Sequence, residues 1–302
     1  MDKIVIFGAS GFVGQNIVRG LSTLGCKILG TDLSEIDFER LENVEFITND
    51  ILDSQHVDEM IDGADIVIHL ATSNLRTSLK NPKRNININI GGMMNILESC
   101  RKFKVKKIIY SSASSVYGIP DYLPVDELHA KNPTTVYGVG KYSGEHLLRV
   151  YQELYGIDYF TLRFTNVYGP YQHPSTGGLI PVVLTKILNE DNVTIFGDGS
   201  QTRDFVFVGD IVEMIKRVIL NDHKNIVVNA GSGVNTSILD AVLKCGEVLG
   251  VEPKLEYKKQ EGGERKGFQA DMKLNKNLFG DDFRTTLESG LFTTSEWIKS
   301  LQ

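Results

Sequence analysis

The chain has 302 residues, of which 41% are hydrophobic and 23% charged, and its formal net charge is -6. This composition is typical of a globular protein with one large core or two modest ones, and the negative charge argues against nucleic-acid binding. Three scattered cysteines suit neither a disulfide framework nor a zinc site, and no apolar run is long enough to span a membrane. We therefore expect a protein of the cytoplasm with no bound metal, no nucleic acid and no membrane partner.

Short apolar runs alternate with helix-length segments through the first half of the chain. The runs are 4–7, 27–30, 44–47, 66–70, 108–111 and 159–164. Near-continuous apolar strands separated by helices predict a parallel sheet covered on both faces, because each crossover needs a helix. Residues 85–90 alternate like a strand, but Ile90, Met93, Met94 and Leu97 have helical spacing, so we predict a helix there.

Proline and glycine cluster between Pro170 and Pro181, which predicts a change of domain. We expect a nucleotide-binding domain over 1–168 and a smaller α/β substrate domain over 169–302. The apolar run 226–230 reads as one more strand, so a segment near 203–230 is predicted to return to the first sheet.

Three glycines, Gly8, Gly11 and Gly14, follow the first predicted strand and open a helix. Glycines at such a turn allow a pyrophosphate to approach the free N–H groups of the helix N-terminus, as in the Rossmann-type doubly wound α/β fold. Asp32 ends the second strand, where a carboxylate can accept hydrogen bonds from ribose hydroxyls and repel a 2′-phosphate. Because no Arg or Lys follows within 33–36, we predict NAD rather than NADP. Asp50 ends the third strand, where its carboxylate could accept a hydrogen bond from the adenine amino group. The alternative, that Asp50 is only an acidic residue of a turn, is nearly as good an interpretation.

Tyr137 and Lys141 are four residues apart, which on a helix places both side chains on one face. A nearby ammonium favours the phenolate, so this pair predicts a base that removes a proton from a hydroxyl. The same spacing occurs by chance in many chains, so the pair gains weight only from the motifs around it.

The ordered motifs resemble those of the extended short-chain dehydrogenase/reductase superfamily, in its nucleotide-sugar epimerase and dehydratase branch (UDP-glucose 4-epimerase-like). They run in order over nearly the whole chain: 8–14, Asp32, 69–71, Asn89, 111–118, 137–141, 162–170 and 197–205. The resemblance implies an NAD site lined by Gly8, Gly11, Phe12, Val13, Gly14, Asp32, Asp50, Ile51, Leu70, Ala71, Asn89, Tyr137 and Lys141. It also implies that Tyr137 is the acid/base, that Lys141 holds the nicotinamide ribose and lowers the Tyr137 pKa, and that Asn166 and Arg203 bind the diphosphate of a nucleoside-diphosphate sugar. Relatives pair through a four-helix bundle, so a homodimer is expected.

Two positions depart from the family pattern. Many relatives carry a catalytic Ser or Thr four positions before Tyr117, where this chain has Ala113, so Ser112 or Ser114 must serve and we favour Ser112. Relatives also carry an arginine where this chain has Glu261, so that phosphate contact is lost or moves to Arg265 or Lys259.

The serine loop also bears on the reaction. Dehydratases of this branch use an Asp-Glu pair where this chain has Ser114 and Ser115, and decarboxylases carry a glutamate there, so both reactions are disfavoured. What remains is an NAD-dependent epimerase acting at C4 through a transient 4-keto sugar in carbohydrate biosynthesis. The alternatives are an NAD(P)H-dependent 4-ketoreductase of a deoxysugar nucleotide and a non-catalytic dinucleotide-binding protein.

Overall fold

The computed structural model describes residues 2–36, 38, 41–259 and 267–301. The chain divides into two compact units. The first contains Met1–Ile119, Leu128–Phe164 and Val212–Val228, and the second contains Pro120–Glu127, Thr165–Ile211 and Asn229–Gln302. Each unit is therefore built from segments that are far apart in the sequence.

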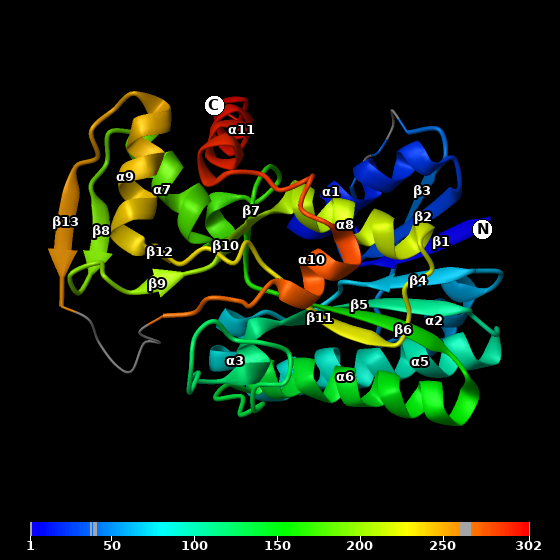
Figure 1. Ribbon diagram of the computed structural model, residues 1–302. Helices are drawn as coiled ribbons and strands as arrows, with labels where there is room; N and C mark the ends of the chain where they lie inside the picture. The colour runs from blue at the N-terminus through cyan, green and yellow to red at the C-terminus, as the bar shows by residue number, and fades with distance from the viewer. Residues whose placement is uncertain (1, 37, 39–40, 260–266, 302) are drawn as a thin grey trace. The chain divides into compact units, whose positions relative to one another are not determined.

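The first unit is organised around a seven-stranded sheet of order β11-β6-β5-β4-β1-β2-β3 (Figure 1). Its strands are β1 (Lys3–Phe7), β2 (Lys27–Asp32), β3 (Val44–Thr48), β4 (Ile66–His69), β5 (Lys107–Ala113), β6 (Asp158–Phe164) and β11 (Ile226–Ala230). Strands β1 to β6 pair in parallel, and β4 and β5 are buried along their whole length. This parallel pairing confirms the predicted doubly wound α/β fold. The central strands carry apolar residues on both faces, and such strands require helices on both sides of the sheet.

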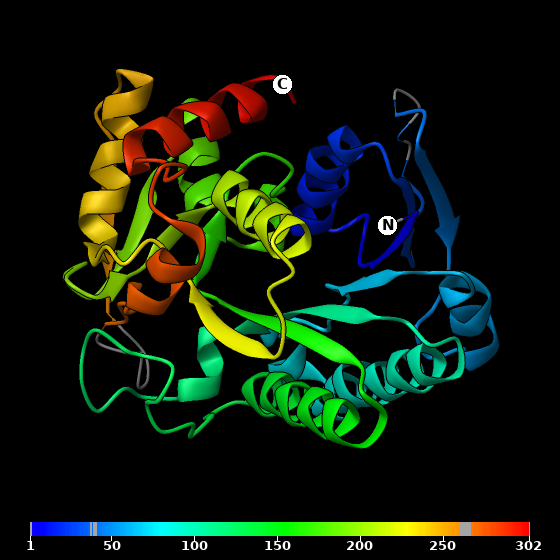
Figure 2. The same cartoon turned by 45° about the vertical axis from the view of Figure 1, so that its right-hand side comes forward.

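Helices cover this sheet, with α2, α5 and α6 together along one face (Figures 1 and 2). They are α1 (Phe12–Leu21), α2 (Ser54–Ile61), α3 (Leu75–Lys80), α4 (Pro82–Ile86), α5 (Met93–Lys102), α6 (Val136–Tyr155) and α8 (Val208–Leu220), with 3-10 turns at Ser22–Leu24 and Ser114–Tyr117. A π-helical stretch, Asn87–Gly92, joins α4 to α5, so the predicted helix over the alternating segment is confirmed. None of the helices among the described residues is both long and apolar enough to cross a membrane.

Helix α6 approaches the sheet closely because its buried face carries glycine. Thr135 caps its N-terminus by accepting a hydrogen bond from the Gly138 N–H (3.1 Å). A Cβ on Gly144 would lie 2.5 Å from the hydroxyl of Tyr110 on β5, so only glycine allows this separation. The close approach brings the buried Lys141 side chain down to the carboxyl end of β5.

The second unit has a separate core in which α7, α9 and α11 pack on short strands. Its elements are β7 (Asn166–Tyr168), a 3-10 turn (Pro174–Thr176), α7 (Leu179–Leu188), β8 (Val193–Phe196), β9 (Thr202–Arg203), β10 (Phe205–Phe207), β12 (Thr236–Ser237), α9 (Ile238–Leu249), β13 (Leu255–Lys258), α10 (Lys273–Phe279) and α11 (Leu287–Lys299). The strands form three pairs, of which β7–β10 and β8–β13 are parallel and β9–β12 is antiparallel.

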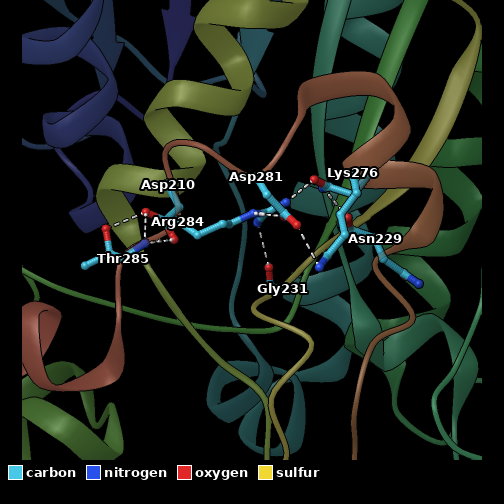
Figure 3. A network of polar contacts seen from close by, with 8 residues as sticks. Asp210, Asn229, Gly231, Lys276, Asp281, Arg284 and Thr285 are labelled. Atoms are coloured by element: carbon cyan, nitrogen blue, oxygen red, sulfur yellow. Dashed lines mark hydrogen bonds and ion pairs between the residues drawn. The ribbon is translucent and has the colours of Figure 1, made fainter.

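A polar network in the second unit holds the segment after β11 (Figure 3). Arg284 donates to the carbonyl of Gly231 (3.1 Å) and to the side chain of Asn275. The buried Asp210 accepts hydrogen bonds from the N–H (3.2 Å) and the hydroxyl (2.6 Å) of Thr285. Arg284 thus holds the start of the loop that follows β11, while Asp210 holds the neighbouring Thr285.

Candidate functional site

The glycine turn lies where the strand order of the sheet reverses, between β1 and β4. The N–H groups of Leu70 and Ala71 both donate to the carbonyl of Phe7 (2.8 and 3.0 Å), so the ends of these two strands are joined. A Cβ on Gly8 would lie 2.6 Å from the Ala71 nitrogen, and Gly8 itself has φ of 88°. In open α/β sheets, ligands bind outside the carboxyl ends of the strands at this reversal.

Helix α1 starts from the same turn without a side-chain cap. Its N-cap residue is Gly11, and the helix begins at Phe12 and Val13. A Cβ on Gly14 would lie 2.0 Å from the Gly8 carbonyl oxygen, so the turn can be this tight only with glycine. The N–H groups of the first helical turn are therefore open to an anion such as a pyrophosphate.

Acidic residues stand at the ends of β2 and β3, on the same edge of the sheet. The Asp32 carboxylate accepts hydrogen bonds from the N–H of Ser10 in the glycine turn (3.2 Å) and of Leu33 (2.8 Å). Asp50 accepts from the N–H of Leu52 (2.9 Å), and Ile51 is buried beside the π-helical stretch. The carboxylate of Asp32 is thus held at the turn, where a ribose would meet it.

Asn49 is a residue that the sequence did not single out. It is 6% exposed, and neither its Oδ1 nor its Nδ2 has a hydrogen-bond partner within the part of the chain that the structure describes. Its backbone N–H donates to the carbonyl of Asp32 (2.8 Å). A buried amide whose NH₂ group and carbonyl oxygen both lack partners, beside Asp32 and Asp50, fits a ligand that carries both a donor and an acceptor, as an adenine edge does.

Asn89, predicted to line the cofactor site, lies in the π-helical stretch and holds the loop after β4. Its Oδ1 accepts from the Ser73 N–H (2.8 Å) and the Thr72 hydroxyl (3.0 Å). Its Nδ2 donates to the Ser73 carbonyl (3.0 Å) and to Asn85 (3.1 Å). These bonds engage both polar atoms of the side chain, so within this structure Asn89 positions the loop that follows Leu70 and Ala71.

Tyr137 and Lys141 stand at the N-terminal end of α6, one helical turn apart. The Lys141 ammonium donates to the carbonyl of Ser111 at the end of β5 (2.7 Å). It lies 5.9 Å from the centre of the Tyr137 ring and 5.0 Å from that of Tyr110. The structure therefore brings the predicted pair together at the carboxyl edge of the sheet.

Burial controls the pKa values of Tyr137 and Lys141. Burial lowers the pKa of Lys141 from 10.5 to about 7, and burial raises the pKa of Tyr137 from 10.0 to about 12. The net pKa of Tyr137 is thus set by burial, and the lowering effect of the Lys141 charge stays a prediction. Loss of hydration penalises the charged forms of both side chains. Because the Lys141 amine loses its proton above about pH 7, its charge offsets little of the penalty on the Tyr137 phenolate.

The hydroxyl of Ser112 is directed into a buried ion pair. It donates to Glu145 Oε1 (2.5 Å), and Glu145 accepts two further hydrogen bonds from Arg163 on β6 (2.9 and 2.7 Å). Arg163 also donates to the Tyr117 hydroxyl (2.9 Å). This cluster, which the sequence did not predict, ties the middle of α6 to β5 and β6 and takes up the one proton that Ser112 can donate.

The remaining serines of the loop differ in their partners. The Ser111 hydroxyl donates to the carbonyl of His69 (3.2 Å). Ser114 and Ser115 lie in the 3-10 turn that packs on the start of α6, where a Cβ on Gly138 would be 2.7 Å from the Ser115 carbonyl oxygen. The Ser115 hydroxyl is buried and has no hydrogen-bond partner among the described residues.

The second unit carries the residues predicted to bind a diphosphate. Asn166 on β7 donates through its side chain to the carbonyl of Asp204 (3.2 Å), and the neighbouring Arg203 on β9 donates to the Thr202 carbonyl (2.9 Å). Asn166 and Arg203 therefore bind carbonyls two residues apart in the same short segment. Glu261 and Arg265 lie outside the described residues, and Lys259 is exposed. Across the described residues, no group of three His, Cys, Asp or Glu side chains could hold a metal ion.

Together, the reversed strand order and the glycine turn at its carboxyl edge define a dinucleotide-binding α/β protein. The model of the NAD dependent epimerase/dehydratase family matches residues 4–231, and this chain belongs to that family.

Similar proteins cover almost all of the chain. A putative UDP-glucose 4-epimerase of Methanocaldococcus jannaschii is 37% identical over 304 residues, which is 98% of each chain. The solved UDP-glucose 4-epimerase of Thermotoga maritima with UDP-glucose has a TM-score of 0.93 and 31% identity, over 99% of this chain and 100% of that one. The UDP-glucuronic acid 4-epimerase of Bacillus cereus, solved with UDP-glucuronic acid and NAD, has a TM-score of 0.90 and 30% identity over the same shares.

Proposed function

We propose that this protein is an NAD-dependent epimerase that acts at C4 of a nucleoside-diphosphate sugar. The observation that carries the proposal is the placement of Tyr137 and Lys141 on one face of α6, with the Lys141 ammonium bound at the carboxyl end of β5. The similar proteins named above as UDP-sugar 4-epimerases support the same reaction. Ser114 and Ser115, in place of an acidic pair, leave no carboxylate in the loop to drive dehydration.

The residues of the first unit would bind the cofactor and move one proton. The N–H groups after Gly11 and the carboxylate of Asp32 would hold the pyrophosphate and a ribose, and Asn49 offers its amide to the adenine. When bound, NAD supplies the acceptor for a hydride from C4 and later returns it. Tyr137 would take the proton of the C4 hydroxyl and give it back after the hydride returns to the other face.

The pKa values of Tyr137 and Lys141 bear on when Tyr137 would act as a base. With a pKa near 12, its hydroxyl keeps its proton at neutral pH in the free protein. The charged form of Lys141 favours the phenolate, but with a pKa near 7 that form dominates only in acid. We expect the working base to form only in the loaded site, where Lys141 gains hydrogen-bond acceptors from the ligand.

Among the loop serines, Ser115 is the better candidate for the hydroxyl that Ala113 lacks. Ser112 already donates its proton to Glu145, so it can contribute to a proton path only as an acceptor. The Ser115 hydroxyl is free to donate and to accept. Ser115→Ala should lower kcat while Ser112→Ala should mainly lower thermal stability, and the reverse pattern would restore Ser112 to the role first predicted.

Replacement of Tyr137 by Phe tests the reaction. Removing a general acid/base costs about 10²- to 10⁴-fold in rate, and the variant should keep its bound NAD because the glycine turn is untouched. Interconversion of UDP-glucose and UDP-galactose, or of the corresponding UDP-glucuronates, is followed by chromatography. Near-normal rates in the variant would exclude Tyr137 as the base. Net consumption of added NADH during turnover would instead show a 4-ketoreductase.

We further propose that the enzyme is a homodimer built on α6. An apolar groove of about 340 Å³ runs along α6 and the π-helical stretch and includes Val150 (38% exposed), and the exposed Leu154 (66%) lies one turn further along the helix. The groove is lined by Ile90, Val139, Tyr142, His146, Leu147 and Val150. Helix α6 also carries both Arg149 and Glu153, so a second copy in antiparallel orientation would match opposite charges, and two pairs of helices would form a four-helix bundle.

Light scattering tests the dimer. The wild type should have twice the chain mass of 33.6 kDa, and Val150→Glu should shift it to the monomer. Val251→Glu, at a somewhat more exposed valine of the second unit (46%), should remain dimeric. A monomeric wild type would contradict the proposal.

We also propose that the enzyme serves carbohydrate biosynthesis in the cytoplasm, where its three cysteines, all buried and free, stay reduced. Recovery of the protein outside the cytoplasmic fraction of its source cells would contradict this placement.

A further inference from the structure

The buried carboxylate of Asp204 joins three separate segments of the second unit. It is 0% exposed. Its Oδ1 accepts from the N–H (2.7 Å) and hydroxyl (2.8 Å) of Ser232 and from the hydroxyl of Thr165 (3.3 Å). Its Oδ2 accepts from the N–H groups of Gly233 (3.0 Å) and Ala270 (3.0 Å). Burial raises the pKa of Asp204, and these hydrogen bonds oppose that rise.

The backbone of Asp204 contacts the residues proposed to bind the diphosphate. Its carbonyl accepts from both the backbone N–H (2.9 Å) and the side-chain amide (3.2 Å) of Asn166. Arg203 precedes it in the chain, on a strand that pairs with β12. An amide nitrogen carries two hydrogens, so the Asn166 side chain keeps one for a phosphate oxygen while the other fixes its direction.

We infer that Asp204 is the positioning residue of the diphosphate subsite: by fastening the loops at 232–233 and 270 to its carboxylate, it holds Asn166 and Arg203 in the orientation that binds a nucleoside diphosphate. The inference rests on the proposed function and adds a specific residue to it. Asp204 itself contacts only protein, so its effect on the ligand is transmitted through its own peptide unit to Asn166 and Arg203.

Replacement of Asp204 by Asn isolates this role. A carboxylate only accepts hydrogen bonds, whereas an amide must turn its NH₂ group toward either Ser232 or the N–H groups of Gly233 and Ala270. Either orientation sets donor against donor, so the peptide unit must shift. We expect the affinity for UDP to fall about 10- to 100-fold, the loss that matches one hydrogen bond to a charged group. Affinity for uridine, which lacks the phosphates, should stay within about twofold, because uridine makes no contact with this subsite.

Asp210→Asn is the matched control. Asp210 is likewise buried (3% exposed) and accepts hydrogen bonds from the backbone and the hydroxyl of one residue, Thr285 (Figure 3). Within the part of the chain that the structure describes, its carboxylate hydrogen-bonds Thr285 and not the loop at 232–233, Asn166 or Arg203. Both variants should melt at lower temperature than the wild type, but only Asp204→Asn should lose UDP affinity.

Calorimetry measures the affinity for UDP, dTDP, GDP, ADP and CDP, and for the nucleoside of each as a comparison. Steady-state kinetics with the sugar nucleotide follow. For Asp204→Asn, KM for the sugar nucleotide should rise much more than kcat falls, because the diphosphate does not react. Unchanged diphosphate affinity, or equal losses in both variants, would overturn the inference alone. A wild type that binds none of these diphosphates would overturn the proposed function. Should Asp204→Asn fail to fold, Ser232→Ala decides, since it removes one hydrogen bond to Asp204 and should give a smaller loss of the same kind.

Discussion

The buried pair of Glu145 and Arg163 allows a quantitative test of how α6 is held. The two side chains are 6% and 4% exposed and share two hydrogen bonds, while Ser112 contributes a third to Glu145. Burial alone lowers the pKa of Arg163, but the hydrogen bonds and charge of Glu145 more than offset this, and the net pKa is raised. Removing one member of such a pair leaves the other buried and unpaired, at a cost of about 3–5 kcal/mol.

Glu145→Gln should therefore lower the melting temperature by about 6–20 °C, since about 1 kcal/mol corresponds to about 2–4 °C in a domain of this size. Circular dichroism at 222 nm, a generic helix wavelength, follows the transition. Glu153→Gln, on the same helix, removes an exposed pair with Arg149 (3.2 Å) and should cost at most about 1 kcal/mol.

A third variant separates the charge from the packing. In the double variant Glu145→Leu/Arg163→Met, no charge is left buried, so it should be more stable than Glu145→Gln alone. Recovery will be partial because Ser112 and Tyr117 lose their partners. Equal melting temperatures for Glu145→Gln and Glu153→Gln would refute the argument that burial makes this pair decisive.

Three further predictions concern the cofactor end and the lysine. Gly14→Ala should abolish NAD retention on gel filtration, because its Cβ would lie 2.0 Å from the Gly8 carbonyl oxygen. In Gly11→Ala the Cβ would lie 3.3 Å from the same oxygen, so this variant should retain most of its NAD. Equal retention by the two variants would contradict the steric argument. Asp32→Asn should reduce the preference for NAD over NADP in titrations of the stripped protein, and an unchanged ratio would remove Asp32 from cofactor selection. Lys141→Met should abolish turnover yet stabilise the NAD-free protein at pH 7. The folded-state pKa of Lys141 is lowered from 10.5 to about 7, so the unfolded chain binds more protons between these two pH values. The free energy of unfolding of the wild type should therefore rise with pH across that window, and that of the variant should not. Parallel pH profiles of stability for the two proteins would disprove this prediction.

Local sequence determined the parts of the site that depend on a single element. Alternation of apolar runs and helix-length segments predicted the sheet and its helices, and the glycine turn at Gly8–Gly14 was found from its position after the first strand. The helical face shared by Tyr137 and Lys141 follows from a spacing of four residues alone. These features could be predicted because each depends on backbone geometry within a short stretch of chain.

Partners from distant segments decided the rest. The direction of the Ser112 hydroxyl depends on Glu145 and Arg163, which lie 33 and 51 residues further along the chain. The pKa of Tyr137 is raised by burial, a property of the whole packed unit that the spacing of two residues does not report. A glutamate one helical turn after Lys141, on the same buried face, was the only sequence signal for this cluster.

The sequence by itself thus determined which residue types stand at the ends of which strands, and with them the family and a candidate acid/base pair. The tertiary structure decided which hydroxyls are free, which charges are buried and which loops Asp204 fastens together. The physical reason is that covalent spacing limits where a side chain can start, whereas hydrogen bonds and desolvation depend on every segment that packs against it.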